Sequence, residues 1–125
     1  MSNHLHLILQ SETLPSSDII RDFKKFTANR IIDFMEDGFN ESRKEWILNR
    51  FQYNASKHQR NSKYQVWTHD NHAEELLSTR FIQQKLDYIH QNPVRAGIVQ
   101  NDYEYLFSSA RNYAELSNEL EIDFV

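Results

Sequence analysis

Two histidines near the start of the chain, His4 and His6, are separated by a single residue. On an extended strand, side chains two residues apart point to the same face, about 7 Å apart along the backbone. Two neutral imidazoles held this way form part of a metal site, which then needs a third ligand. The spacing alone leaves the alternative open, a pair of surface or capping histidines that bind no metal.

A tyrosine and an asparagine, Tyr88 and Asn92, lie four residues apart in a segment with helical periodicity. Side chains at this spacing share one face of a helix. Tyr88 is therefore a candidate nucleophile, and the Asn92 amide oxygen is a candidate metal ligand. The structural alternative makes Tyr88 a half-buried helix residue and Asn92 the end of the helix before Pro93.

One strand and three helices are expected to position these residues. Polar and apolar residues alternate from His4 onward, which predicts a strand whose leucines face the core. Apolar spacing predicts three helices. The first covers residues 18–36, the second runs from a cap at Ser42 to about Ala55, and the third runs from a cap at Ser78 or Thr79 to about Gln91. Gly38 is placed to end the first helix, and Asn92-Pro93 the third. The leucines of the opening strand that should face the core are Leu5, Leu7 and Leu9. Three shorter elements are also predicted: an extended piece at Tyr64–Trp67, a helical piece at 105–114 and a terminal strand at Ile122–Val125.

Composition narrows the class of protein. The 125 residues suffice for one modest domain, and the absence of cysteine excludes disulfides and thiolate metal sites. No apolar run reaches the roughly 20 residues of a membrane span, and no signal peptide is recognisable. We therefore expect a cytoplasmic protein without a membrane partner. The net charge of -4 argues against a generic basic nucleic-acid binder, although residues 18–63 hold ten of the fourteen Lys and Arg against seven acids.

Three segments resemble the HUH-type single-tyrosine transposases, especially their REP-associated branch. Met1-Ser2-Asn3-His4-Leu5-His6-Leu7-Ile8 is similar to the family's Met-Pro-Asn-His-Val-His-Leu segment, with Ser2 where proline is usual. The run from Tyr88 to Val99 resembles the Tyr-Ile-x-x-Asn-Pro-Val-x-x-Gly signature, and Phe107–Ala110 resembles a later aromatic-Ser-Ser element. The order and approximate separation of these segments also match.

This resemblance implies roles for four residues. His4, His6 and Asn92 match the ligands of a Mg or Mn ion, and Tyr88 matches the catalytic tyrosine. In the family, the metal polarises a phosphate of single-stranded DNA while the tyrosine oxygen attacks it. The products are a 5′-phosphotyrosine link and a free 3′-hydroxyl, which later rejoins strands.

The resemblance also implies partners. The family binds hairpin-containing single-stranded DNA, so basic residues of the first helix and the following loop are candidates for phosphate contacts, with solubilising charge as the alternative. Family members are often dimers, and a homodimer is therefore a second expected partner. The candidate phosphate-binding residues are Arg21, Lys24, Lys25, Arg30, Lys57, Arg60 and Lys63.

The expected fold is α+β, a single transposase-like domain over residues 1–125. In the family a strand, a helix and a further strand precede the His-x-His strand. We therefore expect a truncated ferredoxin-like HUH domain, mostly helical, whose opening strand lacks its partners and whose activity is reduced. Two other classes of function stay open, a non-catalytic DNA-binding remnant of such a transposase and a metal hydrolase with His-x-His on a strand.

Overall fold

The computed structural model describes residues 4–37, 42–57 and 63–125. The chain forms two compact units, each described by itself. The first consists of the start of the chain up to Ile8 together with Ala73–Val125, and the second is Leu9–His72. Both halves of the candidate site, His4 and His6 on one side and Tyr88 and Asn92 on the other, belong to the first unit.

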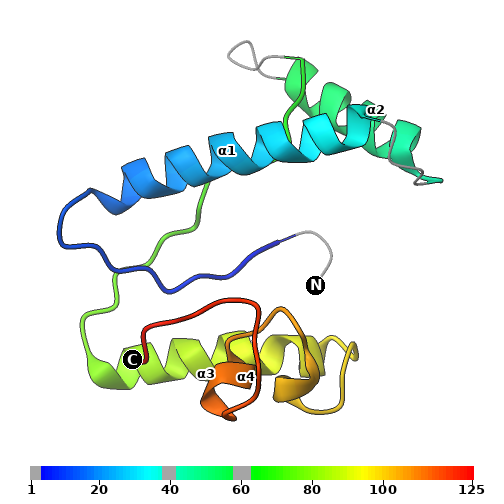
Figure 1. Cartoon of the computed structure of the whole chain (residues 1–125). Helices are drawn as coiled ribbons and strands as arrows, with labels where there is room; N and C mark the ends of the chain where they lie inside the picture. The colour runs from blue at the N-terminus through cyan, green and yellow to red at the C-terminus, as the bar shows by residue number, and fades with distance from the viewer. Residues whose placement is uncertain (1–3, 38–41, 58–62) are drawn as a thin grey trace. The chain divides into compact units, whose positions relative to one another are not determined.

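The second unit contains two helices, α1 (Ser16–Glu36) and α2 (Lys44–Ser56), which pack against each other (Figure 1). Both follow the helices predicted from apolar spacing, although Arg43 rather than Ser42 occupies the N-cap of α2. Gly38, the predicted end of the first helix, lies outside the described residues. Trp67 joins the following loop to α1, because its Nε1 donates a hydrogen bond of 2.9 Å to Thr27 Oγ1.

The first unit is built on α3 (Thr79–Arg95), which packs with the short helix η1 (Asp102–Glu104), and η1 packs in turn with α4 (Ala110–Tyr113). Ser78 caps α3 as predicted, since its hydroxyl accepts a hydrogen bond from the Phe81 amide at 3.3 Å. These elements account for part of the helical piece predicted at 105–114.

The predicted end of the third helix at Asn92-Pro93 is wrong, because Pro93 lies inside α3. The helix ends one turn later in a Schellman motif. The Ile98 amide donates to the Pro93 carbonyl at 3.0 Å, and the Gly97 amide donates to the Val94 carbonyl at 2.9 Å. Gly97 has a φ of +67°, a left-handed conformation that glycine adopts without strain.

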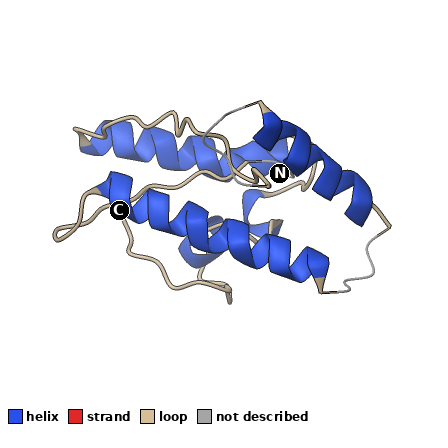
Figure 2. Ribbon diagram, turned by 90° about the horizontal axis from the view of Figure 1, so that it is seen from above, coloured by secondary structure: helices blue, strands red, loops and turns tan. Residues whose placement is uncertain are grey.

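The predicted α+β, ferredoxin-like fold is contradicted, because none of the described residues forms a strand (Figure 2). Residues 4–8 run as an extended segment, but no other backbone in the described ranges forms a ladder with it, and a strand needs such a partner. The prediction that Leu5, Leu7 and Leu9 face the core is also wrong, since their side chains are 50%, 53% and 40% exposed. The strand predicted at Ile122–Val125 is likewise irregular.

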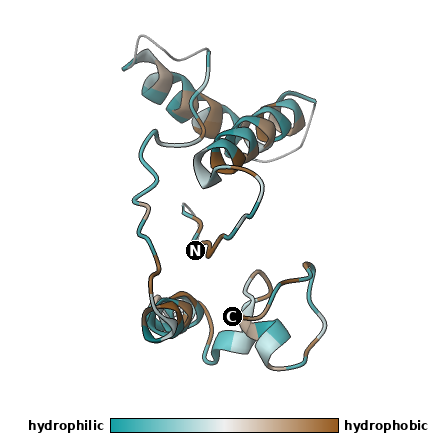
Figure 3. Ribbon diagram, turned by 90° about the vertical axis from the view of Figure 1, so that its left-hand side faces the viewer, coloured by the Kyte–Doolittle hydropathy of each residue, from teal (hydrophilic) through white to brown (hydrophobic). Residues whose placement is uncertain are grey.

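The buried apolar set is small, consisting of Ala55, Leu86 and Ala110 among the described residues. In the first unit, Leu86, His90 and Pro93 form the buried face of α3. Tyr88 lies two positions from Leu86 and His90, so it points to the opposite side of the helix. Figure 3 shows apolar residues interspersed with polar ones over the helix surfaces, which agrees with this modest core.

Within the described ranges, no helix combines the length and apolarity that a membrane crossing requires.

Candidate functional site

His6 and Asn92 meet in the first unit. The amide nitrogen of Asn92, Nδ2, lies 2.8 Å from Nε2 of His6. An amide nitrogen donates, so His6 Nε2 accepts through its lone pair, and the neutral ring then carries its proton on Nδ1. The contact fastens the extended opening segment to the C-terminal half of α3.

The environment of His6 favours the neutral imidazole. Partial burial lowers the pKa of His6 below its ordinary value of 6.5, and the nearby charge of His4 lowers it further. The neutral form is the one that offers a lone pair to a hydrogen-bond donor or a metal ion. His6 is therefore prepared as an acceptor at neutral pH.

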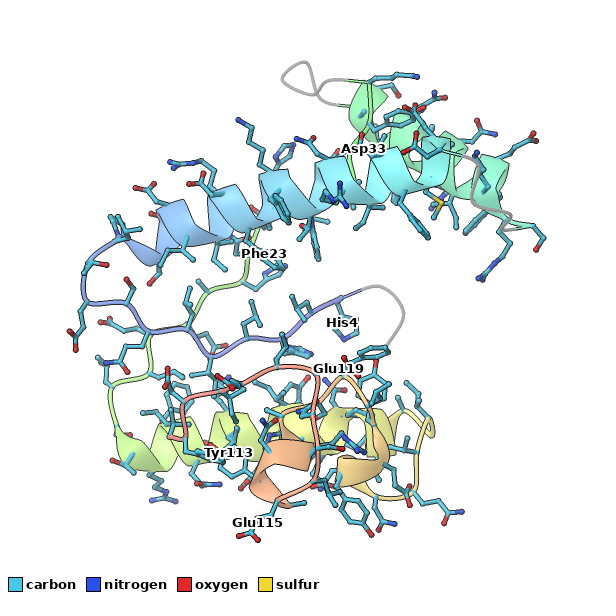
Figure 4. The ribbon with its side chains drawn as sticks, viewed as in Figure 1. His4, Phe23, Asp33, Tyr113, Glu115 and Glu119 are labelled. Atoms are coloured by element: carbon cyan, nitrogen blue, oxygen red, sulfur yellow. The ribbon has the colours of Figure 1, made fainter. Side chains whose placement is uncertain are left out.

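The two histidines are neighbours, as their spacing predicted. The ring centroids of His4 and His6 lie 5.0 Å apart in an edge-to-face arrangement. His4 is exposed and lies near the beginning of the described segment, where Figure 4 labels it. The two rings are therefore close together even though the described residues of this segment are not assigned to a strand.

Tyr88 completes the group on the α3 side. Its ring meets that of His6 edge-to-face, with centroids 5.6 Å apart, and its side chain is 44% exposed. Arg95, two helical turns further on, places its guanidinium carbon 5.6 Å from the centre of the same ring. Tyr88 is therefore held between an imidazole and a guanidinium while part of it faces solvent.

A shallow hollow of about 550 Å³, here called the α3 hollow, lies next to this group. It is open to solvent, and each lining residue in the described part of the chain belongs to α3. Tyr88 thus borders both the histidine–asparagine group and the hollow. The lining residues are Arg80, Gln83, Gln84, Asp87, Tyr88 and Arg95.

A metal ion in this group would need His6 and Asn92 as neighbouring ligands. Among the described residues, no three His, Asp or Glu side chains gather as a metal-binding group, so a site here depends on the Asn92 amide as third ligand. The separation of 2.8 Å between His6 Nε2 and the Asn92 amide is close to the roughly 3 Å between neighbouring ligands of an octahedral ion. Rotation of the amide by 180° would present its oxygen. Imidazole nitrogens favour softer ions than Mg, so this donor set suits Mn better than Mg.

His90 has a structural role, on the side of α3 opposite Tyr88. It is buried, its Nε2 lies 2.9 Å from Ser109 Oγ, and its ring packs against Tyr113 at 5.3 Å. Burial lowers the pKa of His90, while Asp102 and Asp87 oppose the shift. Its hydrogen bond ties α3 to the residue before α4, the short helix whose Tyr113 is labelled in Figure 4.

The predicted DNA-contacting residues belong to the second unit. Several already have partners there: Arg21 pairs with Asp18 and Asp22, Lys24 Nζ donates to the Thr68 carbonyl at 2.8 Å, and Lys63 pairs with Glu36 at 3.3 Å. Lys57 lies over the Tyr53 ring, 4.3 Å from its centroid. Lys25 and Arg30 lie on the exposed surface of α1, and Arg60 is outside the described residues.

Sequence reasoning did not identify Arg95 or Arg80 as part of the site. A seven-residue interval separates Tyr88 from Arg95, and on a continuous helix that interval brings two side chains to one face. Ending the predicted helix at Asn92-Pro93 concealed this relation.

Comparisons of the chain with protein-family models, with curated proteins and with solved structures found no match in any of the three.

Proposed function

We propose that this chain is a DNA-nicking and strand-joining protein that uses Tyr88 as its nucleophile, in the manner of the HUH single-tyrosine transposases it resembles. The observation that carries the proposal is the grouping of His6, Asn92 and Tyr88. The hydrogen bond between His6 and Asn92 joins residues 86 positions apart in the chain, and His6 also contacts the Tyr88 ring. The sequence motifs alone did not require this proximity.

The reaction assigned to Tyr88 requires no external energy source. The Tyr88 oxygen forms a bond to the phosphorus of a DNA phosphodiester and loses its proton. The bond from phosphorus to the 3′ oxygen breaks, and that oxygen leaves as a hydroxyl after taking up a proton. The 5′-phosphotyrosine retains the energy of the bond, so a 3′-hydroxyl attacks it later and restores both the strand and the tyrosine.

His4, His6 and Asn92 would hold the metal ion, Mg or Mn. The ion supplies a positive charge that polarises the phosphate. His6 would contribute a neutral nitrogen, and its ring also contacts Tyr88 edge-to-face. Asn92 positions His6 when no ion is bound.

The proposed partner is hairpin-containing single-stranded DNA, and the proposed location is the cytoplasm. Lys25, Arg30 and Lys57 of the second unit are the described candidates for phosphate contacts that have no carboxylate partner among the described residues. A homodimer is a further proposal. The small buried apolar set supports it, since a second copy would cover more apolar surface.

The direct test is a denaturing gel of the full chain incubated with end-labelled hairpin DNA. A band of protein covalently linked to DNA is expected with Mn or Mg and not with chelator. Tyr88→Phe removes only the hydroxyl and should abolish the band. Tyr105→Phe is a matched control, because Tyr105 lies outside α3 and its ring packs against Phe107, and it should leave the band unchanged.

The same gel distinguishes the alternatives. Binding of hairpin DNA without a linked band in any metal would mean a non-catalytic DNA-binding remnant. Cleavage that persists in Tyr88→Phe, with no linked intermediate, would point to hydrolysis by a metal-bound water. Either result would contradict the proposed function.

A further inference from the structure

The α3 hollow places Tyr88 between two arginines on one helix. Arg80 precedes Tyr88 by eight residues and Arg95 follows it by seven, which corresponds to about 12 Å and about 10.5 Å along the axis. Helical phase puts all three side chains on the same side of α3, and all three line the hollow. A chain-like ligand lying along this face would therefore meet a guanidinium on each side of the tyrosine.

The guanidinium groups of Arg80 and Arg95 have N–H donors that can bind a ligand. Neither Arg80 nor Arg95 forms an ion pair with a carboxylate among the described residues, in contrast to Lys85 of the same helix, which pairs with Glu74. Arg95 rests on the Tyr88 ring, a contact that holds its plane while leaving N–H groups for a ligand. The hollow therefore presents two planar donor forks toward solvent.

One acidic group faces the same hollow. Asp87 accepts a hydrogen bond of 2.9 Å from Gln83, and its charge leaves a local balance of +1 against the two arginines. A carboxylate between the arginines repels an anion from the middle of the hollow and leaves the two ends attractive. This distribution suits a ligand with separated negative charges better than a single compact anion.

We propose that Arg95 and Arg80 bind backbone phosphates of a nucleic acid strand on the two sides of the linkage that Tyr88 attacks. Arginine matches phosphate oxygens in a bidentate manner, and Gln83 and Gln84 add neutral donors along the strand. The placement of the attacked linkage rests on the proposed function. Phosphate binding in the hollow does not, because it depends only on the two arginines.

The experiment measures binding of a dye-labelled single-stranded oligonucleotide by fluorescence anisotropy, with the full chain, in chelator and at several salt concentrations. Arg95→Gln and Arg80→Gln should each weaken binding about fivefold to tenfold at low salt. Each should also reduce the slope of log affinity against log salt by about 0.7, the value for one phosphate contact to a single strand. Arg95→Lys should recover part of the affinity, since it keeps the charge and loses the fork.

Lys85→Gln is the matched control, because it removes one positive charge from the same helix outside the hollow. It should change affinity less than twofold. Circular dichroism of each variant checks that α3 is retained. If Arg95→Gln fails to fold, Arg80→Gln at the other end of the helix decides the question.

The inference is overturned if the unchanged chain does not bind the oligonucleotide, or if the arginine variants behave like Lys85→Gln. Its failure is distinguishable from failure of the proposed function. A Tyr88–DNA band with unaffected arginine variants would overturn the inference alone. Weakened binding by the arginine variants without any covalent band would overturn the nicking activity and uphold the phosphate site.

Discussion

The side-chain amide of Asn92 lies 2.8 Å from Nε2 of His6, across 86 residues of chain. This hydrogen bond, together with the ring contact between His6 and Tyr88, fixes the opening segment to α3. No strand ladder among the described residues shares that task. The position of the histidines therefore depends on a few side-chain contacts.

Asn92→Ala should release this segment without unfolding α3. A hydrogen bond of this kind stabilises by about 1 kcal/mol, which corresponds to roughly fivefold in the open population. Chymotrypsin cleavage after the half-exposed Leu5 and Leu7 should therefore accelerate about fivefold. Gln83→Ala, which removes an amide elsewhere on α3, should leave the rate unchanged. An unchanged rate in Asn92→Ala would show that the hydrogen bond does not hold the segment.

His6→Ala should weaken Mn binding at least about tenfold. Loss of a residue that only hydrogen-bonds to a metal ligand already costs about that much affinity, and loss of the ligand itself should cost no less. Isothermal titration of the metal measures the change. His72→Ala is the control, since His72 lies in an irregular part of the second unit. DNA affinity in chelator should stay within about twofold, because binding depends on Lys and Arg. Equal Mn affinity in the two variants would exclude His6 as a ligand.

Acidification should loosen the first unit. The pKa of His90 is lowered in the folded chain, so the native state holds fewer protons than the unfolded state near the ordinary value of 6.5. The stability that this group contributes is present above pH 6.5 and is lost as the pH falls through the lower folded value. The intrinsic rate of amide exchange itself slows as the pH falls. After correction for that intrinsic rate, hydrogen exchange at α3 amides should be faster at pH 5.5 than at pH 7.5, and His90→Gln should reduce the difference. The reverse trend would contradict the assigned direction.

Much of the helical structure could be predicted from the sequence, because it depends on local periodicity and capping. Apolar spacing located α1 and α3, and Ser78 was recognisable as a cap. The end of α3 was missed because a proline usually stops a helix, whereas here the Schellman motif at Gly97 satisfies the last carbonyls one turn later.

The opening strand was the larger error, and its cause is not local. Alternation from His4 to Leu9 describes which side chains share a face, but strand formation needs a second backbone. The same alternation did correctly indicate that His4 and His6 are neighbours. The contact of Arg95 with Tyr88 could be found only after the helix was known to continue through Pro93.

Tyr88 is proposed to form a covalent bond with DNA. The most direct measurement is mass spectrometry of the protease-digested chain after incubation with hairpin DNA and Mn, followed by nuclease trimming of the attached strand. We expect the peptide that contains Tyr88 to carry a phosphate-linked nucleotide, with the fragment ions placing the added mass on the tyrosine. A nucleotide found on another residue, or no modified peptide while the DNA is cut, would contradict the assignment of Tyr88 as nucleophile.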